Sequence, residues 1–160
     1  MDFITWLDTE QNLVRYFAID PAWSTKEVAR RFQRALPGGR DSFSNVVKRD
    51  ESELPPDKGF ARAWEISGGN IVVNIAKARL VARERLSHLR ETQLPRLKAW
   101  RRMALLLNDA ASAAEAQAEL DTWNDLVVSP LLNTGNLNDL KGLLATALAL
   151  IPIRAPGEPP

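Results

Sequence analysis

The sequence contains no cysteine, which excludes a disulfide framework, a thiolate metal site and a thiol nucleophile. Long apolar runs are also missing, because the longest, 143–153, is interrupted by Thr146 and Pro152 and is too short to cross a bilayer. The first residues, MDFITWLDTEQ, carry acids where a secretion signal needs a basic flank and an apolar stretch. We therefore expect a protein that folds in a reducing cytoplasm, spans no membrane and binds no cofactor.

Charge is unevenly distributed, although the net charge of the 160 residues is +1. Segment 77–102 holds nine basic and two acidic residues, whereas 103–160 holds seven acidic and two basic ones. The hydrophobic share of 45% is typical of a globular chain, so extensive disorder is not expected. The first partner to consider for the basic segment is the acidic half of the same chain.

The N-terminal part has the alternation and composition of short strands around one helix. We predict strands at 3–7, 12–19 and 42–48, a helix at 24–36 that ends at the PGG of 37–39, and a hairpin of strands 61–66 and 71–75. Ser24 and Glu27 have the spacing of a capping box, which would fix the start of the helix. The SGGN between the last two strands supplies glycines for the positive φ angles of a tight turn.

After residue 75 the apolar period changes to that of helices. An apolar stripe follows nearly an eleven-residue repeat, which keeps it straight along one long helix. The stripe comprises Ile75, Ala78, Ala82, Leu86, Leu89, Gln93, Leu97, Trp100, Ala104 and Leu107. We predict helices at 75–108, 110–128 and 136–151, with a kink near Glu91 caused by Pro95. The tight connection at Asn108 and Asp109 predicts that the first two helices lie antiparallel.

The predicted fold class is therefore α+β. A small α+β domain occupies 1–74, with a β platform and one helix. A long antiparallel helical hairpin with a C-terminal leucine-rich helix occupies 75–151, and an extended proline-rich tail occupies 152–160.

Few residues suggest chemistry. Glu84, His88 and Glu91 share one helical face and could hold a metal, but no second cluster of that kind completes a di-metal site, and a solvated histidine among salt bridges is favoured. We expect neither a metal nor a catalytic site. The basic helix could instead bind nucleic acid through Arg83, Arg90 and Arg101. Pairing with the acidic second helix is the favoured interpretation, because its acids lie where an antiparallel partner meets the bases.

Two groups of apolar residues are candidates for partner binding. A small β domain has too little interior for Trp6, Trp23 and Trp64 together, so one of them is expected to anchor an interface. In the last helix Leu143, Leu148 and Leu150 lie off the main stripe, and a single packing surface cannot cover them. We expect these leucines to contact a second protein.

One stretch resembles a known family. The residues RAW at 62–64, GGNIVV at 68–73 and KAR at 77–79, followed by Arg83, Arg85 and Arg90 with leucines between them, are similar to small phage tail-fibre assembly chaperones and tail accessory proteins. The resemblance covers about residues 60–130. It departs after Leu97, where the family usually has an aspartate and this chain has Lys98-Ala99-Trp100.

The resemblance implies a non-enzymatic phage tail component or tail-fibre assembly chaperone that binds a fibre or baseplate protein. It carries over no catalytic residues. The expected location is the host cytoplasm during assembly, or the virion tail if the protein remains in the particle. A second copy of the chain is a further candidate partner, and a nucleic-acid-binding protein is the alternative function.

Overall fold

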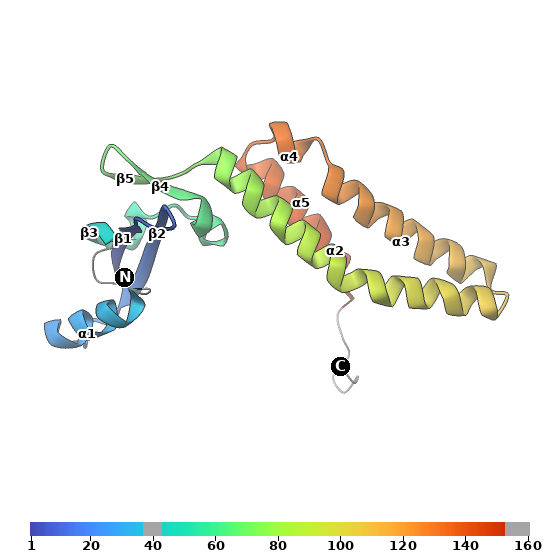
Figure 1. Ribbon diagram of the computed structural model, residues 1–160, viewed down its shortest axis with the longest axis horizontal. Helices are drawn as coiled ribbons and strands as arrows, with labels where there is room; N and C mark the ends of the chain where they lie inside the picture. Colours follow the sequence, from blue (N-terminus) through green and yellow to red (C-terminus); the bar gives the residue numbers. More distant parts are fainter. Residues whose placement is uncertain (37–42, 153–160) are drawn as a thin grey trace. The chain divides into compact units, whose positions relative to one another are not determined.

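The computed structural model describes residues 1–36 and 43–152. Antiparallel strands come first and long helices follow, so the predicted α+β class is confirmed (Figure 1). The predicted PGG helix end at 37–39 and the predicted tail from residue 153 onward lie outside the described residues.

The chain divides into two compact units, Met1–Ala78 and Arg79–Pro160. The predicted boundary after residue 74 falls four residues before this division. The division lies inside the long helix α2 (Ile75–Leu106), so the boundary between the two units does not coincide with the start of this helix.

The first unit contains a three-stranded antiparallel sheet in the order β2-β1-β3. Its strands are β1 (Asp2–Asp8), β2 (Leu13–Ile19) and β3 (Phe43–Asp50). In β1, Phe3 is opposite Ala18 of β2 and Arg49 of β3. Arg49 is buried and donates to Thr5 Oγ1 at 3.2 Å and to the Gly69 carbonyl at 2.6 Å, so this guanidinium connects the sheet to a distant turn.

Successive side chains of β1 point to opposite faces of the sheet, and both faces are covered. On one face Trp6 meets Phe32 of helix α1 (Thr25–Ala35) edge-on at 5.3 Å. The capping box of Ser24 and Glu27 begins this helix, as predicted. The other face carries a hydrophobic cluster with the second hairpin. That cluster comprises Phe3, Val14, Leu54, Trp64 and Ile71.

The second hairpin consists of β4 (Trp64–Ser67) and β5 (Asn70–Val73). Gly68 and Gly69 have φ of 57° and 84°, so the predicted glycine turn is confirmed. The predicted strand at 61–66 starts too early, because residues Lys58–Ala63 form the 3-10 helix η2. The alanines of this segment lack the branched side chains that favour extended backbone.

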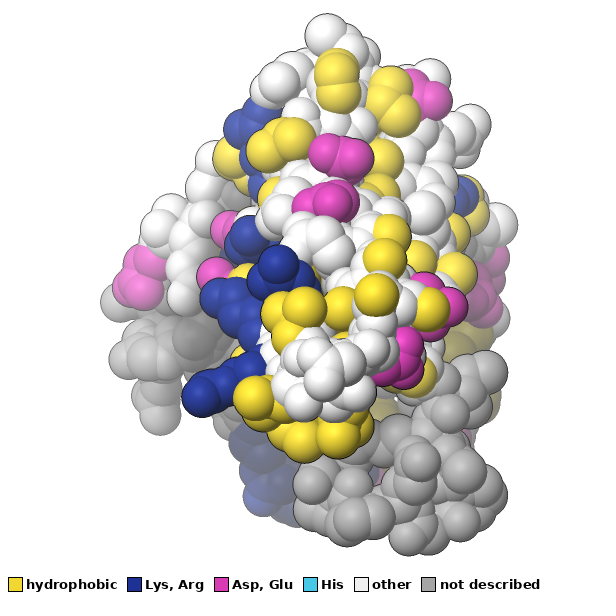
Figure 2. Space-filling model, turned by 90° about the vertical axis from the view of Figure 1, so that its right-hand side faces the viewer, with side chains coloured by type: hydrophobic (Ala, Val, Ile, Leu, Met, Phe, Trp, Pro, Cys, Tyr) yellow, Lys and Arg dark blue, Asp and Glu magenta, His cyan; other side chains and the backbone are white. Residues whose placement is uncertain are grey.

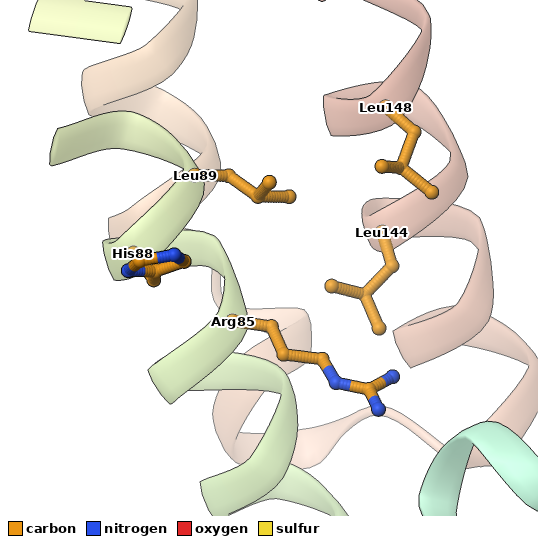
Figure 3. Close-up of a pocket in the computed structure, with 5 residues that line it drawn as sticks. All are labelled: Arg85, His88, Leu89, Leu144 and Leu148. Carbon is orange, nitrogen blue, oxygen red and sulfur yellow. The ribbon is translucent and has the colours of Figure 1, made fainter. Parts of the chain in front are cut away.

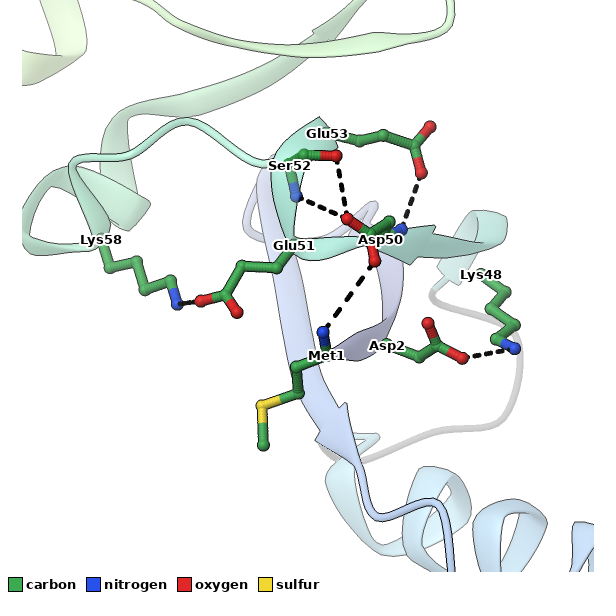
Figure 4. Close-up of polar contacts among 8 residues, drawn as sticks. All are labelled: Met1, Asp2, Lys48, Asp50, Glu51, Ser52, Glu53 and Lys58. Carbon is green, nitrogen blue, oxygen red and sulfur yellow. Dashed lines mark hydrogen bonds and ion pairs between the residues drawn. The ribbon is translucent and has the colours of Figure 1, made fainter.

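Polar contacts hold the N-terminus of β1 to the end of β3 (Figure 4). The Met1 ammonium lies 3.9 Å from Asp50, whose carboxylate also accepts from the Ser52 amide at 3.0 Å and begins the 3-10 helix η1 (Glu51–Glu53). The hydrogen bond from the Ser52 amide is the largest cause that lowers the pKa of Asp50. The Lys58 ammonium binds Glu51 at 2.6 Å, which lowers the pKa of that carboxyl group as well.

The second unit is helical. After α2 come α3 (Ala110–Val128), α4 (Leu131–Thr134) and α5 (Leu137–Ala149). The predicted bounds of α3 are confirmed, and α2 and α5 end two residues earlier than predicted. In Figure 1, α2 changes direction along its length, as expected from Pro95. At the turn, Asn108 has a φ of 56° and Asp109 caps α3 by accepting from the Ser112 amide.

The predicted stripe of α2 faces the interior of this unit over most of its length. Of its members in this unit, Ala82, Leu86, Leu97 and Ala104 are buried, and Leu89 and Trp100 are half-buried. Leu107, the last member of the stripe, is 73% exposed, because α2 has ended and the chain is turning.

Candidate protein-binding groove

A side-chain contact and a buried glycine position the start of α5 against α2. The Arg79 guanidinium of α2 donates twice to the Gly135 carbonyl, at 3.3 and 3.2 Å. Gly135 fits closely beneath α4, because an added Cβ would lie 2.5 Å from the Leu131 carbonyl oxygen. Asn136 and Asp139 then form a capping box that begins α5. The direction of α5 along α2 is thus fixed at its N-terminal end.

Between α2 and α5 lies an open apolar groove of about 250 Å³ (Figure 3). Leu89 of α2 faces Leu144 and Leu148 of α5 across it, and Arg85 and His88 of α2 complete its lining. Leu144 is 8% exposed and forms the floor, whereas Leu148 is 58% exposed. We call this feature the α2–α5 groove.

Three of the five residues that line the α2–α5 groove are leucines. None of the described residues that line it is a carboxylate, serine or cysteine, and its two polar side chains come from one helix. Covering the exposed Leu148 with another apolar side chain is favourable in free energy, because it removes apolar surface from water. The groove can therefore receive an apolar side chain, with a cationic group at its edge.

The leucines predicted to bind a partner differ in exposure. Leu148 lies in the α2–α5 groove and is the most exposed of the three, whereas Leu143 and Leu150 are half-buried. The main stripe of α5, which includes Leu140 and Leu144, is internal as predicted, because these two leucines are 0% and 8% exposed. Of the predicted set, Leu148 is the residue that the fold presents to solvent.

The prediction for the tryptophans is wrong for Trp6 and Trp64, which are 2% and 0% exposed and cannot anchor a surface contact. Trp6 packs against Phe32 of α1 on one face of the sheet, and Trp64 belongs to the hydrophobic cluster on the other face. Trp23 is half-buried, and the guanidinium of Arg31 lies over its ring at 3.8 Å. Trp23 remains the candidate among the three.

Two of the three arginines predicted as alternative nucleic-acid contacts make hydrogen bonds within the second unit. Arg90 donates to Asn124 Oδ1 of α3 at 3.0 and 2.7 Å, and Arg83 donates to Asn133 Oδ1. Within residues 1–36 and 43–152, Arg101 has no hydrogen bond or ion pair. These contacts favour the interpretation that the basic helix serves packing within the chain.

The single histidine lies on an exposed part of α2 at the groove's edge. In the part of the chain that the structure describes, no group of three histidine, aspartate or glutamate side chains could hold a metal ion, and this includes Glu84, His88 and Glu91. Nor is any helix there long and apolar enough to span a membrane.

The sequence alone does not reveal the α2–α5 groove, because helical spacing places Leu89 and Leu144 on the apolar stripes of their own helices. Helical spacing shows which residues share a face, but not where a neighbouring helix stops covering it. Searches of family models, curated proteins and solved structures found no match to this chain.

Proposed function

We propose that this chain is a non-enzymatic phage tail component or tail-fibre assembly chaperone that binds a fibre or baseplate protein through the α2–α5 groove. The observation that carries the proposal is Leu148, a large apolar side chain that is 58% exposed at the edge of an apolar groove. The resemblance of residues 60–130 to small phage tail proteins supplies the class of partner.

The energetics of the groove suit a protein ligand. Full burial of a leucine contributes about 1.5–3 kcal/mol, so covering the exposed part of Leu148 contributes about 1–2 kcal/mol. An amphipathic helix or a loop of the partner could place an apolar side chain between Leu89 and Leu148. This mode of binding requires no cofactor and no reacting group.

The location follows from the proposed role. A chaperone would act in the host cytoplasm during assembly, whereas a permanent component would be found in the virion tail. The presence of the chain in purified particles distinguishes these two forms of the proposal.

A capture experiment with matched variants tests the proposal. Tagged wild-type protein, Leu148→Asp and Ala149→Asp are incubated with a lysate of cells producing the phage, and bound proteins are quantified by mass spectrometry. Both positions lie in the last turn of α5 and are exposed, but Ala149 does not line the groove. A charge at position 148 therefore alters the groove, whereas a charge at position 149 controls for the added carboxylate.

We expect wild type and Ala149→Asp to retain one fibre or baseplate protein that Leu148→Asp loses. Equal capture by all three proteins would show that the α2–α5 groove is not the binding site. Capture of nucleic acid in place of a tail protein, with an affinity that falls steeply with salt, would replace the proposal with the nucleic-acid alternative.

A further inference from the structure

The outer faces of α2 and α3 carry charges of opposite sign along the hairpin that these two helices form. Lys98 and Arg102 are exposed on α2, and within residues 1–36 and 43–152 neither makes a hydrogen bond or ion pair. Asp125 on α3 is likewise exposed and unpaired within these ranges, and Asp121 accepts a hydrogen bond from Gln117 alone. Both helices thus keep charges that their own packing does not neutralise.

Internal contacts show how α2 and α3 run past each other. Arg96 pairs with Glu119 at 2.5 Å, and Arg90 binds Asn124, so lower numbers on α2 meet higher numbers on α3. The contact is therefore antiparallel, as predicted. It uses charges at the sides of the helices and leaves their outer faces to solvent.

On each outer face the exposed residues recur with helical spacing and form a row. The outer α2 row consists of Lys98, Arg102 and Leu106, and Leu106 is 67% exposed. The outer α3 row consists of Ala118, Asp121 and Asp125, all of them exposed. Figure 2, which looks onto the turn between α2 and α3, shows basic side chains gathered on one side with hydrophobic side chains next to them, whereas acidic side chains occur in the middle and on both sides.

The positions of the two rows along the hairpin match. At about 1.5 Å per residue from Asn108, Arg102 lies about 9 Å and Lys98 about 15 Å from the turn. By the same measure Asp121 lies about 20 Å and Asp125 about 26 Å from it. A second copy displaced by about 11 Å along the hairpin would bring Arg102 to Asp121 and Lys98 to Asp125 together.

The same displacement gives the exposed leucine a partner. Leu106 lies about 3 Å from the turn and Ala118 about 15 Å, so the leucine would lie on the small alanine surface of the neighbouring copy. One offset thus satisfies two charge pairs and one apolar contact. Because the charges and the spacing of the two rows are complementary, they fit another copy of this chain.

We propose that the chain associates with itself through these rows, with the outer α2 row of one copy against the outer α3 row of the next. The contact is heterologous, because each copy uses two different surfaces, and repetition produces a ring or an open chain of subunits. The rows do not include the lining of the α2–α5 groove, so this association does not depend on the proposed function.

Charge reversal tests the self-association. Sedimentation over a wide range of protein concentration, at low and high salt, compares wild type with Lys98→Glu/Arg102→Glu, with Asp121→Lys/Asp125→Lys and with the variant that combines all four changes. Lys26→Glu/Arg30→Glu is the matched control, because it reverses two exposed charges at the same spacing on α1 of the other unit. Circular dichroism confirms that each variant retains its helices.

We expect wild type and the matched control to associate with rising concentration, more weakly at high salt. Each double reversal at the rows should weaken association about tenfold or more, because two pairs become repulsive. The fourfold variant should recover association, since its charges are exchanged and again complementary. A wild type that stays monomeric at every concentration overturns the proposal, as does a folded fourfold variant no better than either double variant.

Discussion

Two single substitutions, Gly135→Ala and Gly142→Ala, should change the free energy of unfolding in opposite directions. An alanine Cβ at Gly135 would lie 2.5 Å from the Leu131 carbonyl oxygen, an atom that already accepts from the Gly135 amide at 2.8 Å. The neighbour is backbone, so it cannot rotate away as a side chain could. At Gly142, inside α5, an added Cβ meets nothing within 4 Å.

The magnitudes follow from these surroundings. Overpacking lowers the free energy of unfolding by about 1–3 kcal/mol. Replacing glycine by alanine also makes the unfolded chain less flexible, which raises the free energy of unfolding by about 0.4–1 kcal/mol. Gly135 has a φ of −63°, which alanine adopts without strain, so no further backbone cost is added. The two opposing effects together should lower the free energy of unfolding of Gly135→Ala by about 1–2 kcal/mol. For Gly142→Ala the removal of an interior helical glycine should instead stabilise the unit by about 0.5–1 kcal/mol.

Denaturant unfolding followed by circular dichroism at 222 nm measures both changes, because the second unit is mainly helical. Gly135→Ala should lower the midpoint and Gly142→Ala should raise it. If Gly135→Ala is as stable as wild type, α4 and α5 do not pack as closely as described, and the geometry of the α2–α5 groove loses its support.

Two further predictions concern the interior and the charged network. Leu140→Ala should lower the free energy of unfolding by about 2–5 kcal/mol, because Leu140 is fully buried. Leu89→Ala should lower it clearly less, because Leu89 lines the open groove. Equal losses of the two variants in denaturant melts would contradict this difference. Lys58 lowers the pKa of Glu51, so this pair stabilises the fold fully above the ordinary value of 4.5 and loses that effect as the pH falls through the lowered pKa. Glu51→Gln should therefore unfold earlier than wild type at neutral pH and together with it in strong acid, and a difference that persists in acid would count against the pair.

Local signals were sufficient for most of the secondary structure. The capping box of Ser24 and Glu27 and the turn at Gly68 and Gly69 each depend on residues close in sequence, and the structure confirms both. The uninterrupted helical period likewise predicted α3 at its observed bounds. These features could be predicted because neighbouring residues alone determine them.

Contacts between distant residues could not be predicted in the same way. Trp6 is buried because Phe32, 26 positions away, packs against it, and no periodicity in either segment signals this contact. The α2–α5 groove depends on where α5 stops covering α2. Gly135 matters through its approach to the Leu131 carbonyl, which its sequence neighbourhood does not reveal.

Site-specific photo-crosslinking from position 148 is the most direct test of the proposed protein-binding groove. A photoreactive amino acid replaces Leu148 in one protein and Ala149 in a control, both are expressed in phage-producing cells, and mass spectrometry identifies the crosslinked peptides. The account predicts that position 148 links to one defined segment of a tail-fibre or baseplate protein, and that position 149 gives much less of this product. Links from position 148 to no partner, or to the same set of proteins as position 149, would contradict it.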